Sequence, residues 1–211
     1  MIARYYMVNT VLIVIDVQND FCPGGALAVP EGDAILPVIN RIIDRFPHAA
    51  ATQDWHPRHH ASFASNHPGT NPYDTIDIHG VTQTLWPDHC VQGTKGADFH
   101  PDLPSERFNV IIRKGMNPTV DSYSAFIEND KKTRTGLDGY LRSIGARRVF
   151  LCGLATDYCV FYSAMDAVGL GFETAVVLDA CRGIDLPAGN VNRCVESMKT
   201  NGIHIIQSSD L

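Results

Sequence analysis

One run of aliphatic residues near the start of the chain limits the possible folds more than any other feature. Residues 11–17 read Val-Leu-Ile-Val-Ile-Asp-Val, with no alternation of polar and apolar positions. A β-branched run of this kind predicts a strand that is buried on both faces. Because buried parallel strands are covered by helices on both sides, the run favours a layered α/β protein.

Strand-like and helix-like segments alternate along the rest of the chain. Further strands are predicted at 49–52, 110–112, 148–152, 172–178 and 203–206, and helices at 33–46, 136–145, 157–170 and 190–200. This alternation implies right-handed crossovers and parallel pairing. We therefore predict a doubly wound α/β fold, with a mainly parallel six-stranded sheet flanked by helices on both faces.

Length and composition narrow the class of protein. The 211 residues fit a single domain, 1–211, and the 45% apolar and 19% charged fractions are typical of a compact globular chain. A net charge of −6 without a basic stripe argues against a nucleic-acid partner. No apolar run of about 18 residues predicts a membrane span. The first residues lack a signal-peptide cleavage region and the six cysteines lack disulfide spacing, so we expect a cytoplasmic protein.

A long segment at about 56–109 interrupts the regular alternation. It is rich in proline, has little periodicity, and holds seven of the nine histidines. Loops of this length inside a compact domain are usually functional. We expect any metal site to use this insertion.

Reactive side chains follow four of the predicted strands. Asp16 ends the first, Asp54 the second and Lys114 the third, while Cys159 follows the fourth. Each alone has an ordinary structural explanation, such as a turn former or a buried thiol. Because ligands of open α/β sheets bind beyond the carboxyl ends of the strands, the four together favour a catalytic cleft.

The segment 153–160, Gly-Leu-Ala-Thr-Asp-Tyr-Cys-Val, gives this cleft its chemistry. Thr156 and Asp157 are natural N-caps, which would place Cys159 in the first turn of a helix, where the dipole favours thiolate over thiol. A thiolate can attack an amide or ester carbonyl if Asp16 accepts its proton and Lys114 stabilises the charges. Backbone N–H groups at the helix start could hold the oxyanion.

A second constellation predicts a metal site. Asp54 and His56 project to the same face of an extended segment, and His89 in the long loop could complete a set of two histidines and one carboxylate. Such a set with open positions is typical of catalytic rather than structural sites. A hydrogen-bonded turn explains the first pair equally well. The alternatives to His89 that spacing leaves open are His59, His60 and His67.

Several motifs extend over most of the chain, from about Val11 to Ile206. They are Ile15–Phe21 (IDVQNDF), Pro23–Leu27 (PGGAL), Asp54–Pro57 (DWHP), Trp86–Cys90 (WPDHC), Lys114–Gly115, and the segment 153–160. Together they resemble the nicotinamidases, within the isochorismatase-like cysteine hydrolase superfamily. Asp-x-Gln marks only the superfamily, whereas the FCPGG, DWHP and WPxHC boxes are more specific to nicotinamidases.

The resemblance implies roles for particular residues. It implies a catalytic triad of Asp16, Lys114 and Cys159, and a cis peptide before Ala155 that shapes an oxyanion hole from the N–H groups of Ala155 and Cys159. It implies one divalent transition metal, with zinc ahead of iron and manganese, held by Asp54, His56 and His89, with water in the remaining positions. The side chains expected to line the ring pocket are Phe21, Trp86 and Tyr123, with Phe126 as a rival to Tyr123.

The resemblance also implies an activity. The expected reaction is metal-dependent hydrolysis of nicotinamide to nicotinate and ammonia, and of pyrazinamide to pyrazinoate, through a cysteine thioester in NAD salvage. The metal would orient the substrate or, alternatively, activate water. Small-molecule substrates are the expected partners, and a homo-oligomer is compatible with the family. The alternatives are another superfamily amidase, acting on a different small amide or carbamoyl amine, and a non-enzymatic metal-binding or regulatory module.

Overall fold

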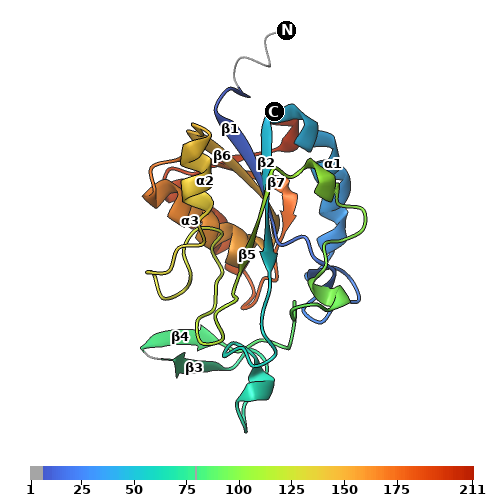
Figure 1. The fold of residues 1–211 in the computed structure, drawn as a ribbon, viewed down its shortest axis with the longest axis vertical. Helices are drawn as coiled ribbons and strands as arrows, with labels where there is room; N and C mark the ends of the chain where they lie inside the picture. Colours follow the sequence, from blue (N-terminus) through green and yellow to red (C-terminus); the bar gives the residue numbers. More distant parts are fainter. Residues whose placement is uncertain (1–6, 79) are drawn as a thin grey trace.

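The computed structural model describes residues 7–78 and 80–211, and its centre is a six-stranded sheet (Figure 1). All the strand pairs in this sheet are parallel. In spatial order the strands are β5 (Val110–Lys114), β2 (His48–Asp54), β1 (Thr10–Ile15), β6 (Arg148–Leu154), β7 (Glu173–Arg182) and β8 (His204–Ile206). Every residue of β1 is buried, which explains the unbroken apolar run. The predicted parallel sheet is confirmed.

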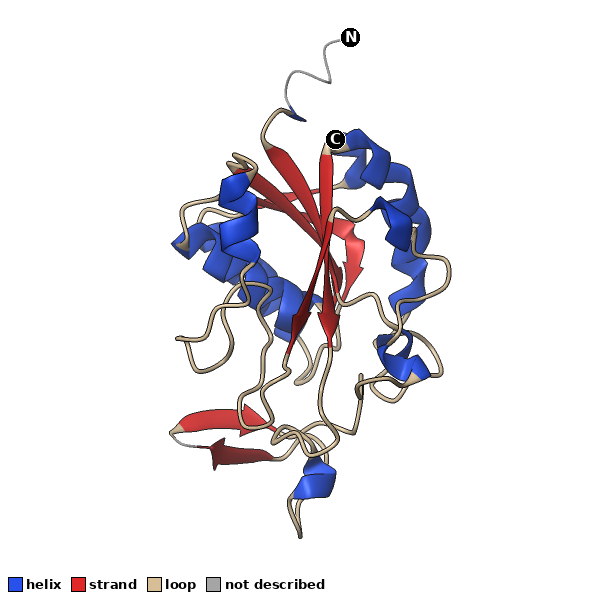
Figure 2. Cartoon of the chain, viewed as in Figure 1, coloured by secondary structure: helices blue, strands red, loops and turns tan. Residues whose placement is uncertain are grey.

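Helices cover both faces of the sheet, as the sequence predicts. Figure 2 shows α1 (Leu36–Ile42) on one side and α2 (Leu137–Ser143) with α3 (Phe161–Gly169) on the other. The last helix, α4 (Asn190–Thr200), packs against α3 and β8. None of the helices in these two described ranges is long and apolar enough to cross a membrane.

Element boundaries differ from the predicted ones in informative places. The first strand ends at Ile15, because Asp16 adopts a left-handed φ of 51° and turns the chain. The helix predicted from residue 33 is shortened to α1 and flanked by 3₁₀ turns at Gly32–Ile35 and Ile43–Arg45. The segment Thr156–Val160 forms a π-helical turn, and α3 begins only after it.

The long insertion contains a small hairpin that the sequence analysis did not predict. Strands β3 (Thr75–Ile78) and β4 (Val81–Thr84) pair antiparallel and lie apart from the main sheet (Figure 2). They are short, and β3 has no fully buried residue, so neither carries the apolar run that marks the other strands.

Strand register brings the reactive residues to one edge of the sheet. Asp54 and Lys114 are paired across β2 and β5 as the last residues of their strands. Ile15 is paired with Gly153, so Asp16 follows β1 close to the turn that carries Cys159. The part of the insertion that carries β3 and β4 lies beyond these carboxyl ends (Figure 1), and its last residues return to the amino end of β5.

Candidate active site

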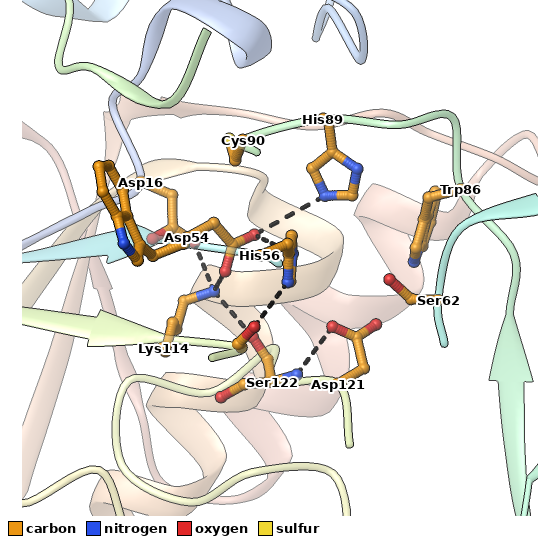
Figure 3. Close-up of polar contacts among 12 residues, drawn as sticks. Asp16, Asp54, His56, Ser62, Trp86, His89, Cys90, Lys114, Asp121 and Ser122 are labelled. Atoms are coloured by element: carbon orange, nitrogen blue, oxygen red, sulfur yellow. Dashed lines mark hydrogen bonds and ion pairs between the residues drawn. The ribbon is translucent and has the colours of Figure 1, made fainter. Parts of the chain in front are cut away.

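The Lys114 ammonium connects the reactive side chains at this edge (Figure 3). Its Nζ atom lies 2.8 Å from Oδ2 of Asp16, 2.5 Å from Oδ1 of Asp54 and 2.8 Å from the carbonyl oxygen of Ser122. The Sγ atom of Cys159 is 3.6 Å away. The structure therefore brings together all three residues of the expected triad.

The opposite charges at this centre stabilise one another. Burial opposes the charge of Lys114, but Asp16 and Asp54 outweigh it and hold the pKa of the ammonium well above its usual value. Burial also opposes the charge of Asp54, yet Lys114 and the nearby His56 keep the pKa of that carboxyl below its usual range. Lys114 is thus a fixed cation, and Asp54 a fixed anion.

Asp16 is held in place by its neighbour on β2. The Thr52 hydroxyl donates to Oδ1 of Asp16 (2.7 Å) and accepts from its backbone N–H (3.2 Å). Burial raises the pKa of Asp16, and the Lys114 ammonium offsets only part of this rise. A carboxylate with a raised pKa is better matched to accepting and returning a proton near neutral pH.

Cys159 faces this carboxylate from the turn after β6. Its Sγ atom and one carboxylate oxygen each from Asp16 and Asp54 all lie within 4.8 Å of one another. The peptide bond between Leu154 and Ala155 is cis, as the resemblance implied.

Two expectations about this turn are wrong. Neither Thr156 nor Asp157 caps the helix; the carboxylate of Asp157 binds a different segment, residues 184–190. Burial also raises the pKa of the Cys159 thiol well above its usual value, more than the Lys114 ammonium lowers it. Cys159 is therefore a thiol that needs a base, since desolvation outweighs the opposite charge of Lys114.

The residues of the expected metal set also converge. Oδ2 of Asp54 lies 3.5 Å from Nε2 of His56 and 3.9 Å from Nε2 of His89 (Figure 3). The Nδ1 atoms donate to the carbonyl oxygens of Gly115 (2.9 Å) and Pro87 (2.8 Å), so in the neutral form of each ring the lone pair is on Nε2, the atom that faces Asp54. This arrangement fixes the tautomer of a metal-binding histidine.

The donor set fits a divalent transition metal. The buried Nε2 atom of His56 has no hydrogen-bond partner among the described residues. Burial, and to a lesser extent His56, lowers the pKa of His89 to about 4, which leaves its imidazole neutral with a lone pair available at neutral pH. A carboxylate and two imidazoles suit zinc, iron and manganese.

The rival histidines are occupied or remote. Nδ1 of His60 accepts from the Ser62 hydroxyl (2.7 Å), and its Nε2 donates to the Val120 carbonyl (3.2 Å). His67 contacts the Ala61 carbonyl (2.8 Å) and His59 is exposed. His56, His60 and Asp121 form a further possible donor group, but both ring nitrogens of His60 are already engaged. The geometry favours His89.

Gln18 fixes Asp54 through its backbone. Its side chain accepts from the Asp54 N–H (2.8 Å) and donates to the Asp54 and Ala97 carbonyls (2.8 Å each). In the sequence, Asp-x-Gln marks only the superfamily. The spacing of two residues could have indicated that Gln18 lies beside Asp16 at the same strand end.

Comparison with known proteins identifies the family of this chain. The family model for the isochorismatase domain matches residues 10–210. The chain belongs to the isochorismatase family. It is 47% identical to the nicotinamidase of Acinetobacter baylyi over 203 residues, covering 96% of this chain and 94% of that protein.

Two solved isochorismatase-family structures are also similar. One, a nicotinamidase and pyrazinamidase from Acinetobacter baumanii, shares 50% identity and a TM-score of 0.93, covering 96% of this chain and 97% of that chain. The other is the pyrazinamidase of Pyrococcus horikoshii in complex with zinc, with 41% identity and a TM-score of 0.77, covering 94% and 99%.

A small pocket opens onto the reactive residues of this family member. Cys159, Asp54 and His89 contribute to its wall, as do the three expected ring contacts, Phe21, Trp86 and Tyr123. The Trp86 indole N–H donates to the Tyr123 hydroxyl (3.2 Å). The rival Phe126 instead stacks on Phe172 in the core, with ring centroids 6.1 Å apart.

Sequence reasoning missed several pocket residues. Leu27, Asp121, Tyr158 and Ile184 also form the wall. Tyr158 and Leu27 lie inside quoted motifs, which could have indicated them. Ile184 had no such signal because the segment that carries it reaches the pocket through tertiary contacts alone.

A larger hollow of about 770 Å³ lies elsewhere on the molecule. Arg148, Glu173 and His204, the first residues of β6, β7 and β8, help to form it. It is therefore at the amino ends of the strands, and none of the reactive residues described above contributes to it.

Proposed function

We propose that this chain is a nicotinamidase, which hydrolyses nicotinamide to nicotinate and ammonia and pyrazinamide to pyrazinoate, in NAD salvage. The observation that carries the proposal is that Lys114 contacts both Asp16, beside Cys159, and Asp54, beside His56 and His89. A covalent amidase centre and a metal-binding set thereby share one pocket. The similarity to curated nicotinamidases supports the choice of amide.

Catalysis begins with proton transfer. Asp16 accepts the proton of the Cys159 thiol, and the thiolate attacks the carboxamide carbon to form a C–S bond. The carbonyl oxygen becomes an oxyanion, held by the backbone N–H groups of Ala155 and Cys159. One well-placed donor of this kind typically contributes about 3–4 kcal/mol.

Asp16 completes both half-reactions. It returns its proton to the amide nitrogen as the C–N bond breaks, so that ammonia leaves and a thioester remains on Cys159. Asp16 then accepts a proton from water as the water attacks the thioester, and the released thiolate is protonated again. Lys114 stabilises the carboxylate and thiolate states throughout.

The metal would be held by Asp54, His56 and His89, with zinc as the proposed ion. When bound, it would supply a Lewis-acidic contact for the pyridine nitrogen or, alternatively, lower the pKa of a bound water. Phe21, Trp86 and Tyr123 would contact the ring. We also propose a single domain with residues 56–109 as the metal-binding insertion, a cytoplasmic location, and a possible homo-oligomer.

Ammonia release tests this function. The protein is assayed with nicotinamide and with benzamide, which lacks the ring nitrogen, before and after chelation and after zinc is restored. We expect nicotinamide turnover that falls on chelation and recovers with zinc, and benzamide turnover that is much slower. Equal turnover of both amides would contradict recognition of the ring nitrogen. Turnover of a carbamoyl amine, but not of nicotinamide, would favour the alternative amidase.

A further inference from the structure

A buried carboxylate outside the triad joins the nucleophile turn to one wall of the pocket. Asp157 is 2% exposed, two residues before Cys159, and forms no ion pair with a described residue. Its Oδ1 atom accepts from the Ile184 N–H (3.0 Å), and its Oδ2 atom accepts from the Asp185 N–H (3.0 Å) and the Asn190 side chain (3.1 Å). All three donors belong to the segment 184–190.

Further contacts hold the segment 183–190 against the turn that carries Asp157. The Tyr158 hydroxyl donates to the Leu186 carbonyl (3.3 Å), so two consecutive residues of the turn bind the same segment. A Cβ atom on Gly183 would lie 2.9 Å from Oδ1 of Asp157 and would collide with Val191. A side chain at residue 183 would therefore push the segment away from the carboxylate.

The segment reaches the pocket through Ile184. This side chain forms the wall together with Leu27, Tyr158 and Cys159. Its backbone N–H is one of the groups that Asp157 binds. Because this N–H and two further donors of the segment end on one buried carboxylate, Asp157 holds the Ile184 backbone in place.

We propose that Asp157 is a positioning residue that holds segment 183–190 against the nucleophile turn and thereby sets the size of ring that the pocket accepts. The inference rests on the proposed function for its substrate. Loss of the carboxylate would let Ile184 retreat, leaving Asp16, Lys114 and Cys159 in place. Binding of the ring would then weaken more than the chemical steps.

Hydrogen exchange and kinetics on three variants test this. Asp157→Asn replaces an acceptor oxygen with a donor, and Asn190→Ala removes one of the three donors without changing Asp157. The matched control is Asp179→Asn, whose carboxylate accepts from the Ser208 N–H (2.7 Å) and lines no part of the pocket. Amide exchange is measured in peptides covering residues 183–190. The values of kcat and KM are measured for nicotinamide and for the bulkier 5-methylnicotinamide.

For Asp157→Asn we expect exchange at residues 184 and 185 to quicken about tenfold or more. We expect KM for nicotinamide to rise about tenfold, kcat to change less, and the preference over 5-methylnicotinamide to shrink. Asn190→Ala should shift each value less, in the same direction, and it decides the matter if Asp157→Asn does not fold. The control should match the wild type.

Unchanged amide exchange in both Asp157→Asn and Asn190→Ala would overturn the proposal. Faster exchange with an unaltered KM and an unaltered preference for nicotinamide would overturn it too. If the wild type does not hydrolyse nicotinamide, the proposed function fails. The exchange measurement, which needs no substrate, then decides alone whether Asp157 holds the segment.

Discussion

The Nζ atom of Lys114 lies 2.5 Å from Oδ1 of Asp54. The other oxygen of the same carboxylate faces the Nε2 atoms of His56 and His89, while Lys114 also contacts Asp16. The Asp54–Lys114 ion pair therefore joins the proposed metal-binding set to the proposed acid–base set. A change at either residue is expected to affect the two sets together.

Replacing the lysine tests this shared position. Lys114→Met leaves Asp16 and Asp54 buried without their cation, so we expect the free energy of unfolding to fall by about 3–5 kcal/mol. The control Lys199→Met removes an exposed ion pair with Glu196 and should cost under about 1 kcal/mol. Urea unfolding of both proteins measures the difference. Equal losses in the two variants would contradict a central role for Lys114.

Removing one proposed metal ligand should weaken metal binding. We expect His89→Ala to lower zinc affinity by about 10²-fold or more, measured by competition with a chromogenic chelator. His67→Ala is the control, because His67 contacts the Ala61 carbonyl rather than the metal set. Loss of affinity in His67→Ala, with His89→Ala unchanged, would give the ligand role to a rival histidine.

Much of this site follows from strand ends. Asp16, Asp54 and Lys114 could be placed together, because parallel strands end on the same side of a sheet and each residue lies at the end of a predicted strand. The choice of His89 could not be made from spacing. It depends on the fold of the insertion, which directs the Nδ1 atom of His89 to the Pro87 carbonyl and its Nε2 atom to Asp54.

The errors arose where tertiary contacts outweigh local preference. Asp157 is a residue type that often caps helices, but its carboxylate accepts hydrogen bonds from three donors in segment 184–190 instead. Cys159 has the position of an activated thiolate, yet burial raises its pKa. A local motif shows neither the desolvation of the Cys159 thiol nor the binding of Asp157 to a segment about 30 residues further along the chain.

The Gln18 clamp should control how firmly Asp54 is held. Gln18→Met leaves the buried N–H and C=O groups of Asp54 without their side-chain partner, so we expect a loss of about 2–4 kcal/mol in stability. We also expect zinc affinity to fall about tenfold, because groups that orient ligands usually contribute this much. Calorimetric titration with zinc and urea unfolding measure the two effects. Wild-type zinc affinity in a folded Gln18→Met protein would contradict the clamp.

Glu128 should make stability depend on pH. Burial, with help from Asp130, raises the pKa of this carboxyl from 4.5 to about 7. Between these values the folded state keeps a proton that the unfolded chain has lost, so the contribution of Glu128 to stability falls as pH rises through the window. Above about pH 7 Glu128 is ionised in the folded state too, and the cost of burying its charge then lowers stability by its full amount.

Glu128→Gln should therefore equal the wild type near pH 4 and exceed it by about 1–2 kcal/mol at pH 8, a figure reduced for solvent screening. Urea unfolding at both pH values measures this difference. Glu106→Gln, at an exposed glutamate, serves as the control and should show no such pH dependence. A gain that is the same at both pH values would contradict the raised pKa.

The most direct test of the account is ammonia release from nicotinamide by the wild type and by Cys159→Ala, with thermal unfolding as the check on the fold. Because Cys159 is the proposed nucleophile, we expect the variant to fold, to bind zinc as the wild type does, and to lose roughly 10⁴-fold or more of its turnover. A folded Cys159→Ala protein that releases ammonia at a rate close to that of the wild type would contradict covalent catalysis by Cys159.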